Sequence, residues 1–371
     1  MATHVADRYA ALEALDWDHL HFFVANAKQA AHYYATAFGF EIAAYAGPET
    51  GLPGRASYLL EQHGLRFALS SALGPDDPIA EHVLKHGDGI RDVALRVPDA
   101  VAAYECTLAG GAISVSAPHV YADDHGKVVL ASIASYGDTI HTFVERDKYH
   151  GPFLPHFRRV TQSPRARHRA GLRHIDHVVG NVGWNEMDRW VRYYRKGFGF
   201  DQLVSFDDKD ISTEYSALRS KVVSDARRRV KFPINEPAKG LKKSQIEEFL
   251  DFYGGAGVQH VAIATDDIVE TVKALKGNGV EFLETPGSYY DALAERVGRI
   301  DEAAETLREL SILVDRDDLG YMLQIFTKPL QDRPTLFFEI IQRRGSLSFG
   351  KGNFKALFVS IEEEQAKRGN F

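Results

Sequence analysis

Three residues in the second half of the chain, His177, His260 and Glu339, are of types that bind transition metals. Glu339 lies in the apolar, strand-like run TLFFEII. Alternate residues of a strand share a face, so Phe337 and Ile341 flank Glu339 on its own face, and the opposite face is also apolar. A carboxylate in such surroundings is costly to desolvate unless a cation, hydrogen bonds or a metal compensates it. A salt-bridged or edge glutamate is the plainer alternative.

Two imidazoles and one carboxylate from separate strands form the facial triad that suits non-haem Fe(II), with three adjacent positions left for substrate and dioxygen. Zinc accepts the same set of ligands, but the phenylalanine-rich surroundings favour iron and oxygen chemistry. Single histidines are mostly structural, so the prediction depends on the convergence of all three residues. His174 lies an odd step before His177 and should point to the opposite strand face.

The elements that must position these residues occur twice. In each copy an apolar residue, Asp and His open a strand-like run, an amphipathic helix follows, and Phe-Gly-Phe ends it. A strand, an Asp-capped helix and another strand come next, and a further strand ends in a charged turn. The matched segments are residues 17–40 and 175–200, 86–115 and 254–283, and 139–149 and 336–345. The later copy carries insertions, of which SYYDALAERVGRIDEAAETLREL is helical by pattern.

At the positions that match the three candidate ligands, the first copy carries His19, Asp92 and Thr142. A threonine replaces the carboxylate, and Asp92 follows Arg91, with which we expect a simple ion pair. We therefore expect no metal in the first half.

The repeats predict an α+β protein whose curved sheets form half-barrels around a cavity. This duplicated module resembles the vicinal-oxygen-chelate (glyoxalase/bleomycin-resistance-like) superfamily, which implies two domains, each of paired βαβββ-type modules forming an open barrel. We expect a metal-free domain at residues 1–155 for structural and subunit contacts, and a linker at 156–173. The catalytic domain, at 174–371, would carry the Fe(II) site and a C-terminal lid helix.

Composition sets outer limits on function. A chain of 371 residues exceeds the usual size of one core. The net charge of -7 and a pI near 6.1 give no reason to expect nucleic acid or an anionic membrane as partner. Cys106 is the only cysteine, which excludes an intrachain disulfide and a cysteine zinc cage. We see no targeting signal and no run of about 18 apolar residues, and expect a cytoplasmic protein.

Several strings over the second half resemble those of the 4-hydroxyphenylpyruvate dioxygenase family, among them SALRSKVV, KFPINEPAKGLKKSQIEEFLDFYGGAGVQHVAI, TPGSYYDAL, LQIFTKPLQDRPTLFFEIIQRRG and FGKGNFKALF. The resemblance implies that His177, His260 and Glu339 bind one Fe(II) per chain. It also implies a substrate pocket with polar and aromatic residues. These are Ser220, Asn235, Gln245, Gln259 and Gln324, with Phe326 and Phe354 as an aromatic clamp.

Strand periodicity agrees with part of this set. Gln324 and Phe326 share a strand face, so an amide and a ring can flank one ligand. Gln259 is adjacent to His260 and by strict alternation should face away from the site. Phe354 lies in the Gly-rich segment before a final helical run that could move as a lid.

The implied activity converts 4-hydroxyphenylpyruvate and O2 to homogentisate and CO2, a step of tyrosine and phenylalanine catabolism. It combines oxidative decarboxylation, ring hydroxylation and side-chain migration, and the substrate's own 2-oxo acid acts as the chelator. The resemblance further implies a homo-dimer or tetramer.

Two other functions stay open. 4-Hydroxymandelate synthase uses the same substrate and hydroxylates the benzylic carbon, although PINEP and Phe354 favour the dioxygenase. A metal-free or zinc-bound, non-catalytic small-molecule-binding protein of the same superfamily is an alternative of another class. A lyase or isomerase of that superfamily would require four protein ligands, and we find three.

Overall fold

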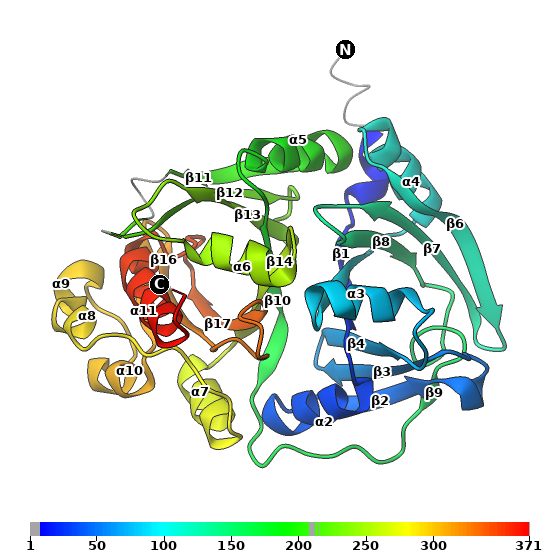
Figure 1. Cartoon of the computed structure of the whole chain (residues 1–371), viewed down its shortest axis with the longest axis horizontal. Helices are drawn as coiled ribbons and strands as arrows, with labels where there is room; N and C mark the ends of the chain where they lie inside the picture. Colours follow the sequence, from blue (N-terminus) through cyan, green and yellow to red (C-terminus); the bar gives the residue numbers. More distant parts are fainter. Residues whose placement is uncertain (1–7, 208–211, 214, 371) are drawn as a thin grey trace.

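The computed structural model describes residues 8–207, 212–213 and 215–370 (Figure 1). Residues 1–7, on which part of the expectation about a targeting signal falls, lie outside the described residues. Two curled sheets stand side by side, one built from each half of the chain (Figure 1).

The first sheet has nine strands in the order β6-β7-β8-β5-β1-β4-β3-β2-β9. Its strands are β1 (Asp16–Phe23), β2 (Glu41–Ala46), β3 (Arg55–Gln62), β4 (Leu65–Ala72), β5 (Gly89–Arg96), β6 (Ser114–Asp123), β7 (Gly126–Ala134), β8 (Ile140–Glu145) and β9 (Arg158–Arg159). Its helices are α2 (Ala27–Ala37), α3 (Pro78–His86) and α4 (Ala100–Ala109).

The second sheet has eight strands in the order β11-β12-β13-β10-β14-β17-β16-β15. Its strands are β10 (Leu172–Asn181), β11 (Asp201–Phe206), β12 (Ala217–Ser224), β13 (Lys231–Ala238), β14 (Gly257–Thr265), β15 (Leu313–Asp317), β16 (Gly320–Phe326) and β17 (Phe337–Arg344). Its helices are α5 (Met187–Phe198), α6 (Gln245–Tyr253), α7 (Ile268–Gly277), α8 (Ser288–Asp291), α9 (Leu293–Val297), α10 (Ala304–Leu310) and α11 (Phe354–Lys367).

Each half consists of two modules with one strand, one helix and three strands, which confirms the predicted fold. The modules start at β1, β5, β10 and β14. The first strands of paired modules run antiparallel, β1 with β5 and β10 with β14. The Asp caps predicted for the second and fourth modules are present, because Asp99 and Asp267 each accept a hydrogen bond from a backbone N–H in the first turn of their helix. The insertion predicted to be helical forms α8, α9 and α10.

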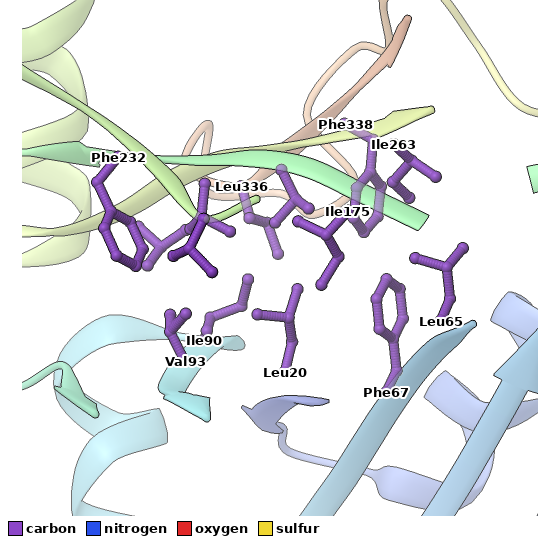
Figure 2. Close-up of a cluster of buried hydrophobic side chains, with 14 of the residues drawn as sticks. Leu20, Leu65, Phe67, Ile90, Val93, Ile175, Phe232, Ile263, Leu336 and Phe338 are labelled. Atoms are coloured by element: carbon purple, nitrogen blue, oxygen red, sulfur yellow. The ribbon is translucent and has the colours of Figure 1, made fainter. Parts of the chain in front are cut away.

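The two halves share one apolar core. Side chains of both sheets interlock between them, as Figure 2 shows for Leu20 and Phe67 of the first half and Ile175, Phe232 and Phe338 of the second. The rings of Phe67 and Phe338 stack with centroids 5.8 Å apart. Burial of such large rings contributes about 1.5–3 kcal/mol each. The contact between halves is therefore part of the folded core.

The predicted linker, residues 156–173, holds the short strand β9 and the start of β10. β9 pairs with β2 at the edge of the first sheet. In the described part of the chain no helix is both long and apolar enough to cross a bilayer.

Candidate metal centre

His177 on β10, His260 on β14 and Glu339 on β17 converge inside the second half, and their ligand atoms all lie within 4.8 Å of one another. Oε2 of Glu339 is 3.3 Å from Nε2 of His177 and 3.6 Å from Nε2 of His260. The three side chains are at most 12% exposed. Three strands that are adjacent in the sheet, β10-β14-β17, hold them, so the sheet itself fixes their separation.

Each imidazole is oriented by the residue that precedes it in the chain. Nδ1 of His177 donates to Oδ1 of Asp176 at 2.7 Å, and Nδ1 of His260 donates to Oε1 of Gln259 at 2.9 Å. With the proton on Nδ1, the lone pair of Nε2 faces the centre in the neutral ring. This is the tautomer that a metal ligand needs.

Two β-bulges allow Asp176 and Gln259 to contact the histidine that follows each of them in the chain. In the ladder of β10 and β14, Ile175 pairs with Ile263 and His177 with Ala262, so Asp176 is an extra residue. The next bulge is on β14, where Val179 pairs with His260 and Gly180 with Val258, which leaves Gln259 as the extra residue. A bulge interrupts strict alternation and re-aims a side chain. The expectation that Gln259 faces away from the site is therefore wrong.

The centre is electrostatically matched to a cation. Burial by itself raises the pKa of Glu339, but the neighbouring imidazoles of His177 and His260 outweigh it and lower the pKa to about 2. Burial also disfavours protonation of both rings. For His260 burial prevails and lowers its pKa, whereas for His177 the carboxylates of Glu339 and Asp176 prevail and raise it. Glu339 is thus ionised, and the buried carboxylate beside two imidazoles suits a cation.

Arg343 stabilises the carboxylate of Asp176, which in turn holds the imidazole of His177. Nε and Nη2 of Arg343 donate to the two oxygens of Asp176 at 2.8 and 2.9 Å, and Nζ of Lys231 lies 3.4 Å from the same carboxylate. Burial acts on Asp176 most, yet these cations and His177 hold its pKa well below the ordinary value. Asp176 therefore stays ionised and keeps its acceptor oxygen for Nδ1 of His177.

The first half repeats this support without the ligand set. Nδ1 of His19 donates to Asp18 at 2.7 Å, and Arg146 donates to both oxygens of Asp18 at 2.6 and 2.7 Å. The predicted ion pair of Asp92 with its neighbour Arg91 is wrong. Asp92 instead accepts hydrogen bonds from the backbone N and the side-chain Oγ1 of Thr142, at 3.0 and 2.5 Å. Arg91 is the extra residue of a bulge there, at the position that matches Gln259.

A cavity of about 80 Å³ opens beside the three candidate ligands. All ten residues predicted for the site line it, namely His177, Ser220, Asn235, Gln245, Gln259, His260, Gln324, Phe326, Glu339 and Phe354. His174 is exposed and does not line the cavity, but the expectation that it lies on the opposite strand face is wrong, because the bulge at Asp176 pairs His174 with Ala264 and His177 with Ala262, two residues on one face of β14. Strands β12, β13, β14 and β16 and helices α6 and α11 therefore bring the predicted pocket residues together in one space.

Aromatic rings form much of the cavity wall. Phe337 stacks on His260 with centroids 4.7 Å apart and planes 18° apart, and Phe349 meets His177 edge-on at 5.4 Å. Phe326 meets His260 edge-on at 6.1 Å and also contacts Phe337 at 6.2 Å, while Phe354 packs against Phe206 of β11 at 5.0 Å. The rings fix the imidazoles and keep the centre apolar outside its ligands.

The polar lining offers unused hydrogen-bonding atoms to a ligand. Oε1 of Gln324 is buried and has no hydrogen-bond partner among the described residues. Nδ2 of Asn235 donates to Oδ1 of Asn181 at 3.3 Å, and Nε2 of Gln259 reaches Oε1 of Gln245 at 3.5 Å, the limit of a hydrogen bond. A buried polar atom without a partner costs about 1–3 kcal/mol, so a polar ligand that reaches Gln324 recovers that free energy.

Comparison with known proteins gives the family. The family model described as "Glyoxalase/Bleomycin resistance protein/Dioxygenase superfamily" matches residues 174–325. The 4-hydroxyphenylpyruvate dioxygenase of Yarrowia lipolytica is 47% identical to this chain and covers 99% of it and 97% of its own length. That of Dictyostelium discoideum is 48% identical, with 95% and 99% covered. The chain belongs to the 4-hydroxyphenylpyruvate dioxygenase family.

Solved structures share the fold of this member of the 4-hydroxyphenylpyruvate dioxygenase family. A triple mutant of 4-hydroxymandelate synthase from Streptomyces coelicolor superposes with a TM-score of 0.84 at 32% identity, over 94% of this chain and 98% of that one. A fusion protein of a xylose isomerase-like TIM barrel and 4-hydroxyphenylpyruvate dioxygenase superposes at 0.73 with 23% identity, over 95% of this chain and 53% of that chain, and shows the same fold.

Sequence reasoning missed several functional residues of this dioxygenase-family site. Phe349 lines the cavity although the sequence did not point to it, and Phe337, which was named only as sharing the strand face of Glu339, lines it too. The support of His177 by Asp176 and Arg343 was also missed. The signal for it was present, because Asp precedes the matched histidine in both halves and an arginine follows four residues after the matched third-strand position, as Arg146 and Arg343.

Proposed function

We propose that the chain catalyses the reaction of its family, in which 4-hydroxyphenylpyruvate and O2 give homogentisate and CO2. The observation that carries the proposal is the convergence of His177, His260 and Glu339 at a cavity lined by every predicted substrate residue. Neither part suffices by itself, since the triad supplies the reactive centre and the cavity holds the organic substrate beside it.

The donor set fits Fe(II), one ion per chain. Two neutral imidazoles and one carboxylate satisfy a divalent ion while leaving coordination positions open. One ionised Glu339 leaves a bound Fe(II) with a net charge of about +1, which attracts the carboxylate of a 2-oxo acid. When bound, the iron supplies the centre at which the oxo acid and O2 react.

The protein's own residues hold and orient the substrate. Polar contacts inside an otherwise aromatic wall come from four side-chain amides and one hydroxyl. These belong to Asn235, Gln245, Gln259, Gln324 and Ser220. Phe326 and Phe354 act as an aromatic clamp on the substrate ring. The same rings exclude bulk water, which keeps the electrostatic attraction at the centre strong and protects reactive species.

The C-terminal helix α11 acts as the lid of this cavity. Phe354, Leu357 and Phe358 line the cavity from α11. Glu362, on a later turn, accepts hydrogen bonds at 2.5 Å from Thr213 and Ser216 on the segment before β12. Release of these bonds would let α11 move without disturbing the sheet.

We place the enzyme in the cytoplasm as a homo-dimer or tetramer. In this proposal residues 1–155 form a metal-free domain for structural and subunit contacts, 156–173 a linker, and 174–371 the catalytic domain. The pathway is tyrosine and phenylalanine catabolism.

The decisive experiment is anaerobic reconstitution with Fe(II), followed by substrate, air and identification of the product. Homogentisate with release of CO2 supports the proposal. 4-Hydroxymandelate would instead assign the activity of the synthase, whose structure is similar to this chain. Identity of 47–48% to the curated dioxygenases against 32% to that synthase favours homogentisate.

The same experiment excludes a non-catalytic binding protein. Such a protein would show no oxygen uptake with Fe(II) and 4-hydroxyphenylpyruvate, and would tolerate Glu339→Ala without losing ligand affinity. The dioxygenase requires uptake of one O2 for each CO2 released, and Glu339→Ala removes it.

A further inference from the structure

A second, smaller cavity of about 30 Å³ adjoins the substrate cavity. The two share three wall residues, Gln245, Gln259 and Phe337. Helix α11 covers both cavities. Its first turns cover the substrate cavity with Phe354, Leu357 and Phe358, and its later turns cover the smaller cavity with Ile361 and Glu364. We call the smaller space, which is lined by residues of α6, α11 and the start of β17, the side cavity.

The inner part of the side cavity is apolar. Phe249 of α6 is 1% exposed, and Leu283, Phe337 and Ile361 complete this part of the wall. Thr327 and Thr335 also line the cavity. Oγ1 of Thr327 accepts a hydrogen bond from the backbone N–H of Phe338 at 3.0 Å, and Oγ1 of Thr335 reaches the carbonyl of Arg333 at 3.5 Å. A mainly apolar wall favours an apolar occupant over water.

The outer part of the side cavity carries charge in paired form. Glu248 is buried and accepts hydrogen bonds from Arg368 at 2.9 Å and from Asn370 at 3.0 Å. Glu364 pairs with Lys367 at 2.8 Å. Because both carboxylates are already paired with cations, a neutral gas molecule can pass them without breaking an ion pair.

The size of the side cavity selects for a very small ligand. A space of ~10–15 Å³ holds one water molecule, so about 30 Å³ holds a diatomic molecule and excludes an aryl oxo acid. Its inner wall also touches the metal centre, because Phe337 stacks on His260 and Gln259 holds Nδ1 of that ring. Between the two cavities, Nε2 of Gln259 lies 3.5 Å from Oε1 of Gln245, which is a long and weak hydrogen bond.

We propose that the side cavity is a binding and entry site for O2 that stays open while the substrate fills the main cavity. The proposal rests on the dioxygenase function proposed above. It gives the enzyme two separate routes, one under the first turns of α11 for the oxo acid and one under its last turns for the gas. The loose contact of Gln245 with Gln259 is the passage to the centre.

Xenon, an apolar atom that binds dry cavities, tests the site without metal or turnover. In crystals of the wild-type protein pressurised with xenon, anomalous scattering should place an atom between Phe249, Leu283 and Ile361. Ile361→Phe and, independently, Leu283→Phe should fill the space and remove that atom. Leu319→Phe, at a side chain that is 66% exposed, is the matched control and should keep it. Xenon absent from the wild type, or water in its place, overturns the proposal.

Kinetics supply the second readout. In each folded filling variant the KM for O2 should rise about threefold or more, while the KM for 4-hydroxyphenylpyruvate and the kcat at saturating O2 change less than about twofold. An unchanged KM for O2 in both variants overturns the proposal even if xenon binds. Absence of O2 uptake by the wild type would contradict the dioxygenase function itself, and the xenon result would then still report on the cavity.

Discussion

Asp176 accepts a 2.7 Å hydrogen bond from Nδ1 of His177, and Asp18 accepts one of the same length from His19 at the matching place in the first half. An arginine, Arg343 or Arg146, grips each carboxylate through two nitrogens. The Asp176–Arg343 pair lies beside the three candidate ligands, whereas the Asp18–Arg146 pair lies beside His19 without such a set. Variants of Asp176 and Asp18 therefore separate the effect on metal binding from the effect on stability.

Asp176→Asn should weaken Fe(II) binding by about 10–100-fold, because loss of the carboxylate frees the orientation and tautomer of His177. Asp18→Asn should leave Fe(II) affinity unchanged. Both variants leave an arginine without its counter-ion, so Asp18→Asn, beside the buried Arg146, should lower the free energy of unfolding by about 3–5 kcal/mol, and Asp176→Asn, beside the half-buried Arg343, by somewhat less. Anaerobic calorimetric titration with Fe(II), together with denaturant unfolding, measures the two effects. Equal Fe(II) affinities in the two variants would contradict the orienting role.

Glu339→Gln should abolish turnover and weaken Fe(II) binding by about 100-fold or more, because a neutral amide replaces the only anionic ligand. His19→Ala is the control, and we expect it to leave one Fe(II) per chain. Iron content after dialysis and oxygen uptake measure both variants. Near-normal iron in Glu339→Gln would remove Glu339 from the ligand set, and loss of half the iron in His19→Ala would show a site in the first half.

Gln324→Met should raise the Kd for 4-hydroxyphenylpyruvate about fivefold, since its buried Oε1 is available to the ligand and one hydrogen bond is worth about 1 kcal/mol. Fe(II) affinity should not change. Gln202→Met, on an exposed position of β11, is the matched control. Anaerobic titration of the Fe(II)-loaded protein with the oxo acid gives both constants. An unaltered Kd in Gln324→Met would mean that the amide does not contact the substrate.

Glu362→Ala should loosen α11, because Thr213 and Ser216 lose their common acceptor. If the closed position of α11 loses about 1.4 kcal/mol of stability, the population of the open helix rises about tenfold. The rate of limited proteolysis within α11 should rise by the same factor. Glu363→Ala changes the exposed neighbouring residue and should have no such effect. Cleavage of both variants at the wild-type rate would argue against the latch.

His141 should make the protein less stable in mild acid. Its ring is fully buried, where Nδ1 donates to the carbonyl of Val93 and Nε2 accepts from the hydroxyl of Tyr194. Burial lowers the pKa of His141 to about 4. Between this value and about 6.5 the unfolded chain binds a proton that the folded protein does not, so the free energy of unfolding falls as the pH falls through that window.

His141→Phe removes this group, and the matching position of the second half already carries a phenylalanine, Phe338. The variant should reduce the loss of stability between pH 6.5 and 4 by about 1 kcal/mol per pH unit. His21 and His82, whose pKa values burial lowers to about 3, keep the rest of the dependence. Urea unfolding at a series of pH values measures the slope. The same slope in both proteins would show that another group titrates.

The sequence alone determined the modular order of the fold and the three candidate ligands. Segments that match along one chain place His177, His260 and Glu339 at equivalent strand positions, and each strand's periodicity depends only on local residues. The family resemblance added the seven substrate-pocket residues. The modular order could be predicted because repeats and alternation are properties of the chain itself, and the roles of the site residues stay predictions.

Only the tertiary structure decided how these parts meet. The bulge at Asp176 adds an unpaired residue to β10 and the bulge at Gln259 adds one to β14, and both are defined by the pairing of the two strands, a relation that neither strand shows by itself. For the same reason Gln259 faces the site, and Asp92 bonds to Thr142 of another strand instead of to Arg91. The wall that the two cavities share and the single core between the halves likewise arise from packing of distant segments, which local patterns do not encode.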